Sequence, residues 1–125
     1  MLDNNLPKMR PQLDLPTTDA TPNERFQNAT LRPILKMQHD WLVEIFKNYL
    51  QKRKNPLPNL SKKQRLDYIE QAVRVDLKFK NRLIGGIIGH FTATELTDFF
   101  TEETELTRRL TDLIIQRLQS AVADF

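Results

Sequence analysis

The stretch RLIGGIIGHFT, residues 82–92, holds all three glycines of this 125-residue chain. Between positions 83 and 91 the only polar side chain is that of His90. A helix that is apolar all round is typically buried on every side, so this segment is predicted to be the innermost helix of the fold. The glycines share one side of its helical wheel and form a predicted helix-packing hub that admits a neighbouring backbone closely: Gly85, Gly86 and Gly89.

A tight corner is predicted directly after this helix. Gly89 lies where a residue in the left-handed conformation would end it. Thr92 and Glu95 then have the spacing of a capping box, in which each side chain accepts a hydrogen bond from the other's backbone. The sequence therefore predicts that a second helix begins at this corner.

The remaining chain has helical periodicity and no alternation typical of strands. Apolar residues recur at steps of three and four over residues 31–54 and 104–122, and a capping signal at Ser61 begins another helix. Asp76 either caps a separate helix running to Ile88 or lies within one helix that continues through Arg74 and Val75. Pro33 either separates a short helix over residues 22–29 from the main one or kinks a single helix. We expect an all-α, up-and-down bundle of four to five helices.

Composition limits the class of protein. The length suits one domain, residues 21–125, after an extended or disordered proline-containing arm over residues 1–20. No cysteine, signal peptide or apolar run of membrane-spanning length is present, so a cytoplasmic protein that does not enter a membrane is predicted. The net charge is +3, and the charges are unevenly distributed along the chain. All charged residues within 47–65 are basic, and all those within 95–105 are acidic. Such polarity favours association between unlike ends of two molecules, or a solvated surface.

The side chains available for chemistry are few. The two histidines, His39 and His90, lack the spacing of a metal site, and no catalytic, cofactor-binding or metal-binding residue is predicted. On the wheel Gln38 and His39 fall among aromatic residues, which indicates a half-buried polar pair at the edge of the core. Together with His90 they are the candidates for a ligand site, the alternative to that structural role.

Three functions remain open, and the first is a non-enzymatic interaction or adaptor protein that associates with itself or a protein partner. This function is motivated by more apolar surface than one small bundle would bury. The apolar arc of the helix over residues 34–50 is wide, and Ile115 lies opposite the apolar stripe of the last helix. The second is binding of nucleic acid through six basic residues: Lys52, Arg53, Lys54, Lys62, Lys63 and Arg65. The third is a small enzyme or ligand binder around Gln38, His39 and His90.

Four segments resemble a family of small uncharacterised bacterial helical proteins, some of which are labelled glyoxalase. They are ERFQNATLRPILKMQ (24–38), FKNYLQKRKN (46–55), FKNRLIGGIIGHFT (79–92) and ELTRRL (105–110). The resemblance covers most of residues 24–118 and implies a small helical protein. It carries over no catalytic residue, because metal-dependent glyoxalases resemble paired βαβββ modules with His and Glu ligands on strands, and this sequence has neither.

Overall fold

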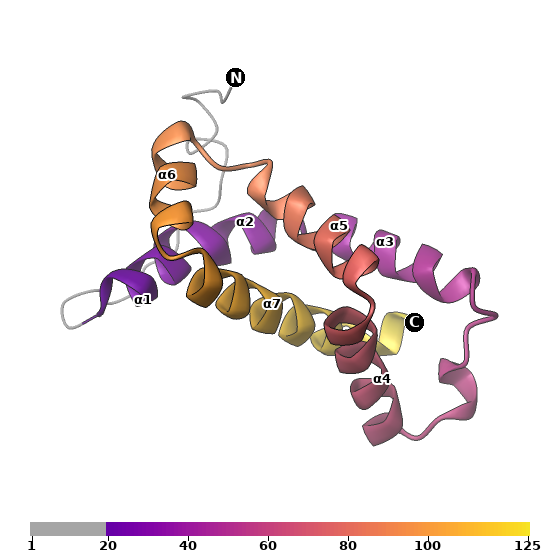
Figure 1. The fold of residues 1–125 in the computed structure, drawn as a ribbon. Coiled ribbons are helices and arrows are strands. Elements are labelled where there is room, and N and C mark those ends of the chain that lie inside the picture. The colour runs from indigo at the N-terminus through magenta and orange to yellow at the C-terminus, as the bar shows by residue number, and fades with distance from the viewer. Residues whose placement is uncertain (1–19) are drawn as a thin grey trace.

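The computed structural model describes residues 20–125, and within them the chain is all-α without a strand, which confirms the predicted fold class (Figure 1). The elements in order are α1 (Pro22–Phe26), a π-helical turn (Gln27–Leu31), α2 (Arg32–Met37), α3 (His39–Gln51), a 3-10 turn (Leu57–Asn59), α4 (Lys62–Val75), α5 (Leu77–Ile88), α6 (Ala93–Thr101), α7 (Glu103–Ser120) and a final 3-10 turn (Val122–Asp124). Apart from Ala20, the predicted arm lies outside the described residues. No helix among residues 20–125 is long and apolar enough to cross a membrane.

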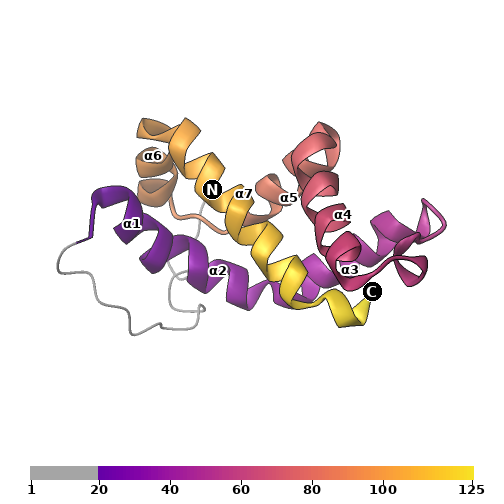
Figure 2. The ribbon, with the colours of Figure 1, turned by 90° about the horizontal axis from the view of Figure 1, so that it is seen from below.

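The innermost helix is α7, not the glycine-bearing α5. It packs against α2, α3, α4, α5 and α6, and in Figure 2 it runs across the middle of the ribbon. Because neighbours lie on several sides of α7, residues away from its main apolar stripe are buried too, including Ile115, which is only 3% exposed. The prediction that Ile115 adds excess apolar surface is therefore wrong. Val43, which widens the apolar arc of α3, is buried as well.

Helix α5 is buried on one face only. Its fully enclosed side chains are Phe79, Leu83 and Ile87, whereas Gly85 and Gly89 are exposed. The prediction of a helix enclosed on every side is wrong for a physical reason: glycine has no side chain to bury, so a glycine-rich face tolerates water without an apolar penalty.

The N-terminal helices form one continuous helical segment in which Pro33 is accommodated by a π turn. Thr21 caps α1 as its pattern indicates, and its hydroxyl accepts a bond from the Glu24 N–H at 3.1 Å. The Arg32 N–H donates to the carbonyl of Gln27, five residues back. This wider turn gives the proline ring the room that an α turn denies it, so the chain stays helical through Pro33.

At the corner between α5 and α6 the predicted capping box forms, but Gly89 does not adopt the predicted left-handed conformation. The Thr92 hydroxyl accepts from the Glu95 N–H at 3.2 Å, and the Glu95 carboxylate accepts from the Thr92 N–H at 2.9 Å. Gly89 has a φ of −58°, which is right-handed, so the predicted left-handed end is wrong. The hydroxyl of the buried Thr30 also donates to Glu95, at 3.1 Å, which ties the π turn to this corner.

The connection between α3 and α4 reverses the chain by an unusual backbone conformation. Lys54 and Asn55 have φ values of 59° and 29°, and the Asn55 side chain accepts a bond from the Leu57 N–H at 3.2 Å. Leu57 is fully buried and anchors the turn. Ser61 then begins α4 with the predicted capping box. The reversal brings the C-terminal end of α3 close to the junction of α4 and α5, where the candidate site lies.

Candidate anion-binding groove between α3 and α5

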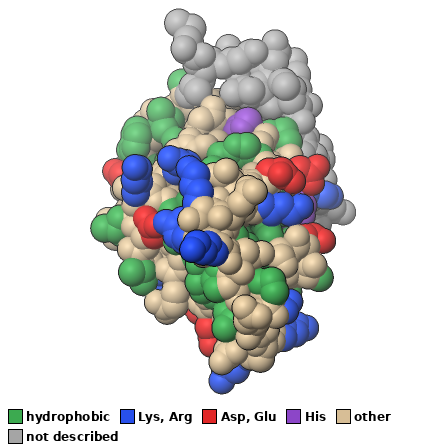
Figure 3. Space-filling model, turned by 90° about the vertical axis from the view of Figure 1, so that its right-hand side faces the viewer, with side chains coloured by type: hydrophobic (Ala, Val, Ile, Leu, Met, Phe, Trp, Pro, Cys, Tyr) green, Lys and Arg blue, Asp and Glu red, His purple; other side chains and the backbone are tan. Residues whose placement is uncertain are grey.

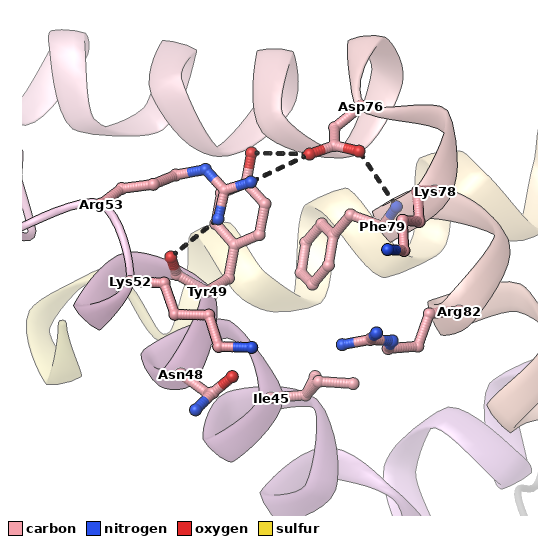
Figure 4. A pocket seen from close by; sticks show the side chains of 9 residues that line it. All are labelled: Ile45, Asn48, Tyr49, Lys52, Arg53, Asp76, Lys78, Phe79 and Arg82. Carbon is pink, nitrogen blue, oxygen red and sulfur yellow. Dashed lines mark hydrogen bonds and ion pairs between the residues drawn. The ribbon is translucent and has the colours of Figure 1, made fainter.

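A groove of about 140 Å³ lies between the C-terminal half of α3 and the N-terminal half of α5 (Figure 4). We call it the α3–α5 groove. Nine residues line it: Ile45, Asn48, Tyr49, Lys52, Arg53, Asp76, Lys78, Phe79 and Arg82. Four of these side chains are basic and one is acidic, so the groove carries an excess of positive charge.

The floor of the groove is apolar and firmly packed. The rings of Tyr49 and Phe79 are stacked with their centroids 4.1 Å apart, and the ring of Phe46 packs against both, at 5.7 Å from Tyr49 and 6.1 Å from Phe79. Phe125 meets Phe46 edge-on, with the ring centroids 4.8 Å apart. Offset aromatic stacking of this kind holds the rings in place. A ligand in the groove therefore meets a preformed surface.

Asp76 already has its partners within the fold. It caps α5, accepting from the Phe79 N–H at 3.1 Å, and it pairs with Arg53 at 3.2 Å. The Tyr49 hydroxyl donates to the same carboxylate at 3.4 Å. Burial, and to a smaller extent Asp76, raises the pKa of Tyr49 above its usual value of 10, so this hydroxyl stays protonated at neutral pH. The guanidinium of Arg53 also lies 3.6 Å from the centroid of the Tyr49 ring, so the positive charge of Arg53 already interacts with groups of the fold.

Three other cations of the groove have no carboxylate partner within the part of the chain that the structure describes: Lys52, Lys78 and Arg82. Figure 4 shows the nitrogen ends of Lys52 and Arg82 directed toward each other across the groove, with the Asn48 amide beside them. Unpaired cations over an apolar floor attract an anion that also carries apolar groups. In the space-filling view, Lys and Arg side chains gather on the face at the right-hand end of Figure 1 (Figure 3).

The six predicted basic contacts are distributed over more than one surface. Lys52 and Arg53 line the groove, whereas Lys54 lies exposed at the chain reversal, and Lys62 and Lys63 are exposed at the start of α4. Arg65 has a structural role, because it donates to the carbonyls of Leu60 and Pro58 at 3.1 and 3.4 Å.

Lys78 and Arg82 belong to the groove and were not predicted. They are distant in sequence from the basic run over residues 47–65. A local signal was present: the two residues lie four apart on α5, and therefore on one face of the helix, immediately after the capping Asp76.

The polar candidates of the core edge are separate from this groove. Gln38 lies at the break between α2 and α3, where its backbone N–H donates to Ile34 and its carbonyl accepts from Leu42. Next to it, Nδ1 of the half-buried His39 lies 3.3 Å from a guanidinium nitrogen of Arg117. His90 is half-buried at the corner after α5. No cluster of three or more metal-binding side chains occurs among the described residues.

Of the three glycines predicted as a packing hub, one has a close neighbour from another helix. A Cβ on Gly86 would lie 2.7 Å from Cζ2 and 2.9 Å from Cζ3 of Trp41, so the close neighbour is a side chain and not the predicted backbone. An added Cβ on Gly85 meets no atom within 4 Å, and one on Gly89 only approaches backbone oxygens, the nearest at 3.4 Å. Only Gly86 therefore depends on the absence of a side chain.

The acidic segment around α6 lies at the end of the molecule opposite to the α3–α4 connection (Figure 1). Figure 1 shows α6 and the start of α7 at one end of the ribbon and the α3–α4 connection at the other. Asp98, Glu102 and Glu103 form no ion pair within residues 20–125, and the neighbouring Phe100 is 55% exposed. We call these four residues the acidic end. Its composition is complementary to that of the α3–α5 groove.

Comparison of the chain with protein-family models, with curated proteins and with solved structures found no match. The resemblance to small bacterial helical proteins therefore stays a prediction.

Proposed function

We propose that the protein is a non-enzymatic interaction module that associates head to tail, with the acidic end of one copy bound in the α3–α5 groove of the next. The observation that carries the proposal is the set of three unpaired cations, Lys52, Lys78 and Arg82, around an apolar floor. Such a groove suits a short acidic segment with an aromatic anchor better than a bare anion.

The acidic end supplies this kind of segment. Asp98 and Glu102 lie two positions before and after the exposed Phe100, so acidic and apolar side chains both project from the C-terminal turn of α6, on different sides of it. An exposed phenylalanine gains free energy when it leaves water for the apolar lining of the groove, which Ile45, Tyr49 and Phe79 supply. Leu77, 63% exposed beside the groove, adds apolar surface at its rim.

The proposed contact joins two different surfaces, so it is heterologous. Repetition of such a contact closes into a ring or continues as a chain. Complementary charges chiefly accelerate the encounter and set its orientation, while burial of the apolar groups supplies affinity. Association should therefore weaken as salt rises.

The test uses two charge variants and light scattering coupled to size-exclusion chromatography. One variant reverses the charge of the groove, Lys52→Glu with Arg82→Glu, and the other neutralises the acidic end, Asp98→Asn with Glu102→Gln. Each keeps one functional surface, so each alone should be monomeric. Mixed in equal amounts, the two should form a dimer and nothing larger, because only one complementary pair of surfaces remains.

A matched control changes the same amount of charge outside the groove, Lys62→Glu with Lys63→Glu, and it should assemble as the wild type does. The proposal is overturned if the wild type is monomeric at every concentration, or if the two variants do not pair although the wild type assembles. Binding of a single-stranded oligonucleotide that is lost in the groove variant and falls steeply with salt would instead assign the groove to nucleic acid.

A further inference from the structure

A second pocket, of about 230 Å³, lies between α2 and α7 and shares no residue with the α3–α5 groove. Six residues line it: Arg32, Leu35, Leu113, Gln116, Arg117 and Ser120. The two helices lie side by side in both ribbon views (Figures 1 and 2). Each contributes one arginine to the pocket, Arg32 from α2 and Arg117 from α7.

Neither arginine has a carboxylate partner in the described part of the chain. Nε of Arg32 donates to the Asn28 side-chain oxygen at 3.1 Å, and Nη1 of Arg117 lies 3.3 Å from Nδ1 of His39. A guanidinium has five N–H donors, and these neutral contacts engage one on each arginine. Both groups therefore keep donors for a ligand.

The two positive charges are close enough to disfavour each other. Partial burial lowers the pKa of Arg117, and the charge of Arg32 lowers it further. Arginine keeps its charge despite such a shift, since its ordinary pKa lies far above neutral pH. Two like charges in a half-buried pocket destabilise the fold when nothing lies between them, and an anion there would reverse the sign of the interaction.

We infer that the α2–α7 pocket binds a phosphate group between the guanidinium groups of Arg32 and Arg117. Two planar forks from different helices can each engage two of the terminal oxygens of a phosphate group, whereas a single fork already satisfies both oxygens of a carboxylate. The Gln116 amide at the pocket wall supplies a further donor. The phosphate is either free or the end of a phosphate monoester, and this inference does not depend on the proposed self-association.

The test is a titration of the full chain with inorganic phosphate at constant ionic strength, followed by NMR of the arginine Nε–H groups. Saturable shifts confined to Arg32 and Arg117 are expected, with affinity at least about tenfold above that for acetate, because more charge-assisted hydrogen bonds form. A parallel titration with phenyl phosphate distinguishes the two sources: tighter binding of the ester indicates a phosphate monoester, and equal or weaker binding indicates free phosphate.

Variants separate a specific site from general attraction. Arg32→Gln and Arg117→Gln should each weaken binding at least about tenfold, by the loss of a charged donor. Lys36→Gln removes one exposed charge a single helical turn from Arg32 and outside the pocket lining, so it should weaken binding much less than Arg32→Gln, because a screened charge makes no hydrogen bond to the ligand. Without phosphate, Arg117→Gln should unfold at the same temperature as the wild type or higher, since it removes the repulsion.

Several results would overturn the inference. They are shifts that grow linearly without saturation, equal weakening by Lys36→Gln, and full affinity in the double variant Arg32→Gln with Arg117→Gln. A marked loss of stability in phosphate-free Arg117→Gln would assign that arginine a structural role through its His39 contact. Arg32→Gln, which leaves that contact in place, would then decide whether the pocket binds phosphate.

Discussion

Two adjacent glycines of α5 should respond oppositely to the same substitution. At Gly86 a methyl group would overlap the Trp41 ring, with Cζ2 and Cζ3 at 2.7 and 2.9 Å and Cη2 closer still. At Gly85, which is exposed, nothing lies within 4 Å. Both residues have helical neighbours on either side, so alanine is conformationally acceptable at each. The pair therefore isolates the effect of packing against one tryptophan.

The magnitudes follow from two opposing contributions. Alanine in place of glycine inside a helix gains about 1 kcal/mol at either position. Overpacking costs 1–3 kcal/mol, about 2 kcal/mol here because three ring atoms must move together. Gly85→Ala should therefore stabilise the protein by about 1 kcal/mol and Gly86→Ala destabilise it by about 1 kcal/mol. At about 4 °C per kcal/mol, their melting temperatures should differ by about 8 °C.

Urea unfolding followed by circular dichroism measures both free energies, and fluorescence adds a local probe because Trp41 is the only tryptophan. In Gly86→Ala its emission should shift to the red as the half-buried ring is pushed toward water. The background Trp41→Leu serves as a control, because removing the ring should make Gly86→Ala as favourable as Gly85→Ala. Non-additivity of this size is expected only for residues in contact.

The reasoning fails if Gly86→Ala is as stable as Gly85→Ala in the presence of Trp41. It also fails if the cost of Gly86→Ala persists in the Trp41→Leu background. Either result would mean that the ring does not rest against the glycine, and that the close approach of α3 to α5 is unimportant for stability.

Three further predictions concern α7 and the groove. Hydrogen bonding from Arg108 lowers the pKa of Glu105 to about 2, so the stabilising effect of this ion pair is complete above the ordinary carboxyl pKa of 4.5 and disappears as the pH falls toward 2. An NMR titration of Glu105 should give a midpoint of about 2, and Arg108→Gln should raise that midpoint. Ile115→Ala should cost about 2–5 kcal/mol in urea unfolding, because a cavity forms in the core, whereas a cost below about 0.5 kcal/mol would place the side chain at the surface. Asp76→Ala should cost about 1 kcal/mol of stability through loss of the α5 cap, and it should lower the pKa of Tyr49 in an ultraviolet titration. An unchanged pKa of Tyr49 would contradict the hydrogen bond between Tyr49 and Asp76.

Helix boundaries were predictable because their signals are local. The capping box of Thr92 and Glu95, that of Ser61 and the cap at Asp76 each need only three or four consecutive residues, and all three form. These bonds depend on backbone groups that no helix can satisfy internally at its own start. The sequence of the turn therefore determines them, whatever packs around it.

The centre of the fold was not predictable in the same way. Burial depends on how many neighbours a helix has, and α7, with charges along one face, has neighbours that cover even Ile115. The groove depends on the same tertiary information. Lys52 and Arg82 come together only because the reversal at Lys54 and Asn55 returns the chain toward α3. Composition identified the basic run but not its partner on α5.

The π turn before Pro33 fixes the length of this part of the chain. It holds one residue more than an α turn would, and Phe26 upstream lies with its ring centroid 5.6 Å from that of Phe91. Deleting Ala29 would close the turn to α geometry and swing Phe26 about 100° around the helix axis, away from Phe91. Evolution can therefore exchange residues in this turn far more readily than it can shorten it.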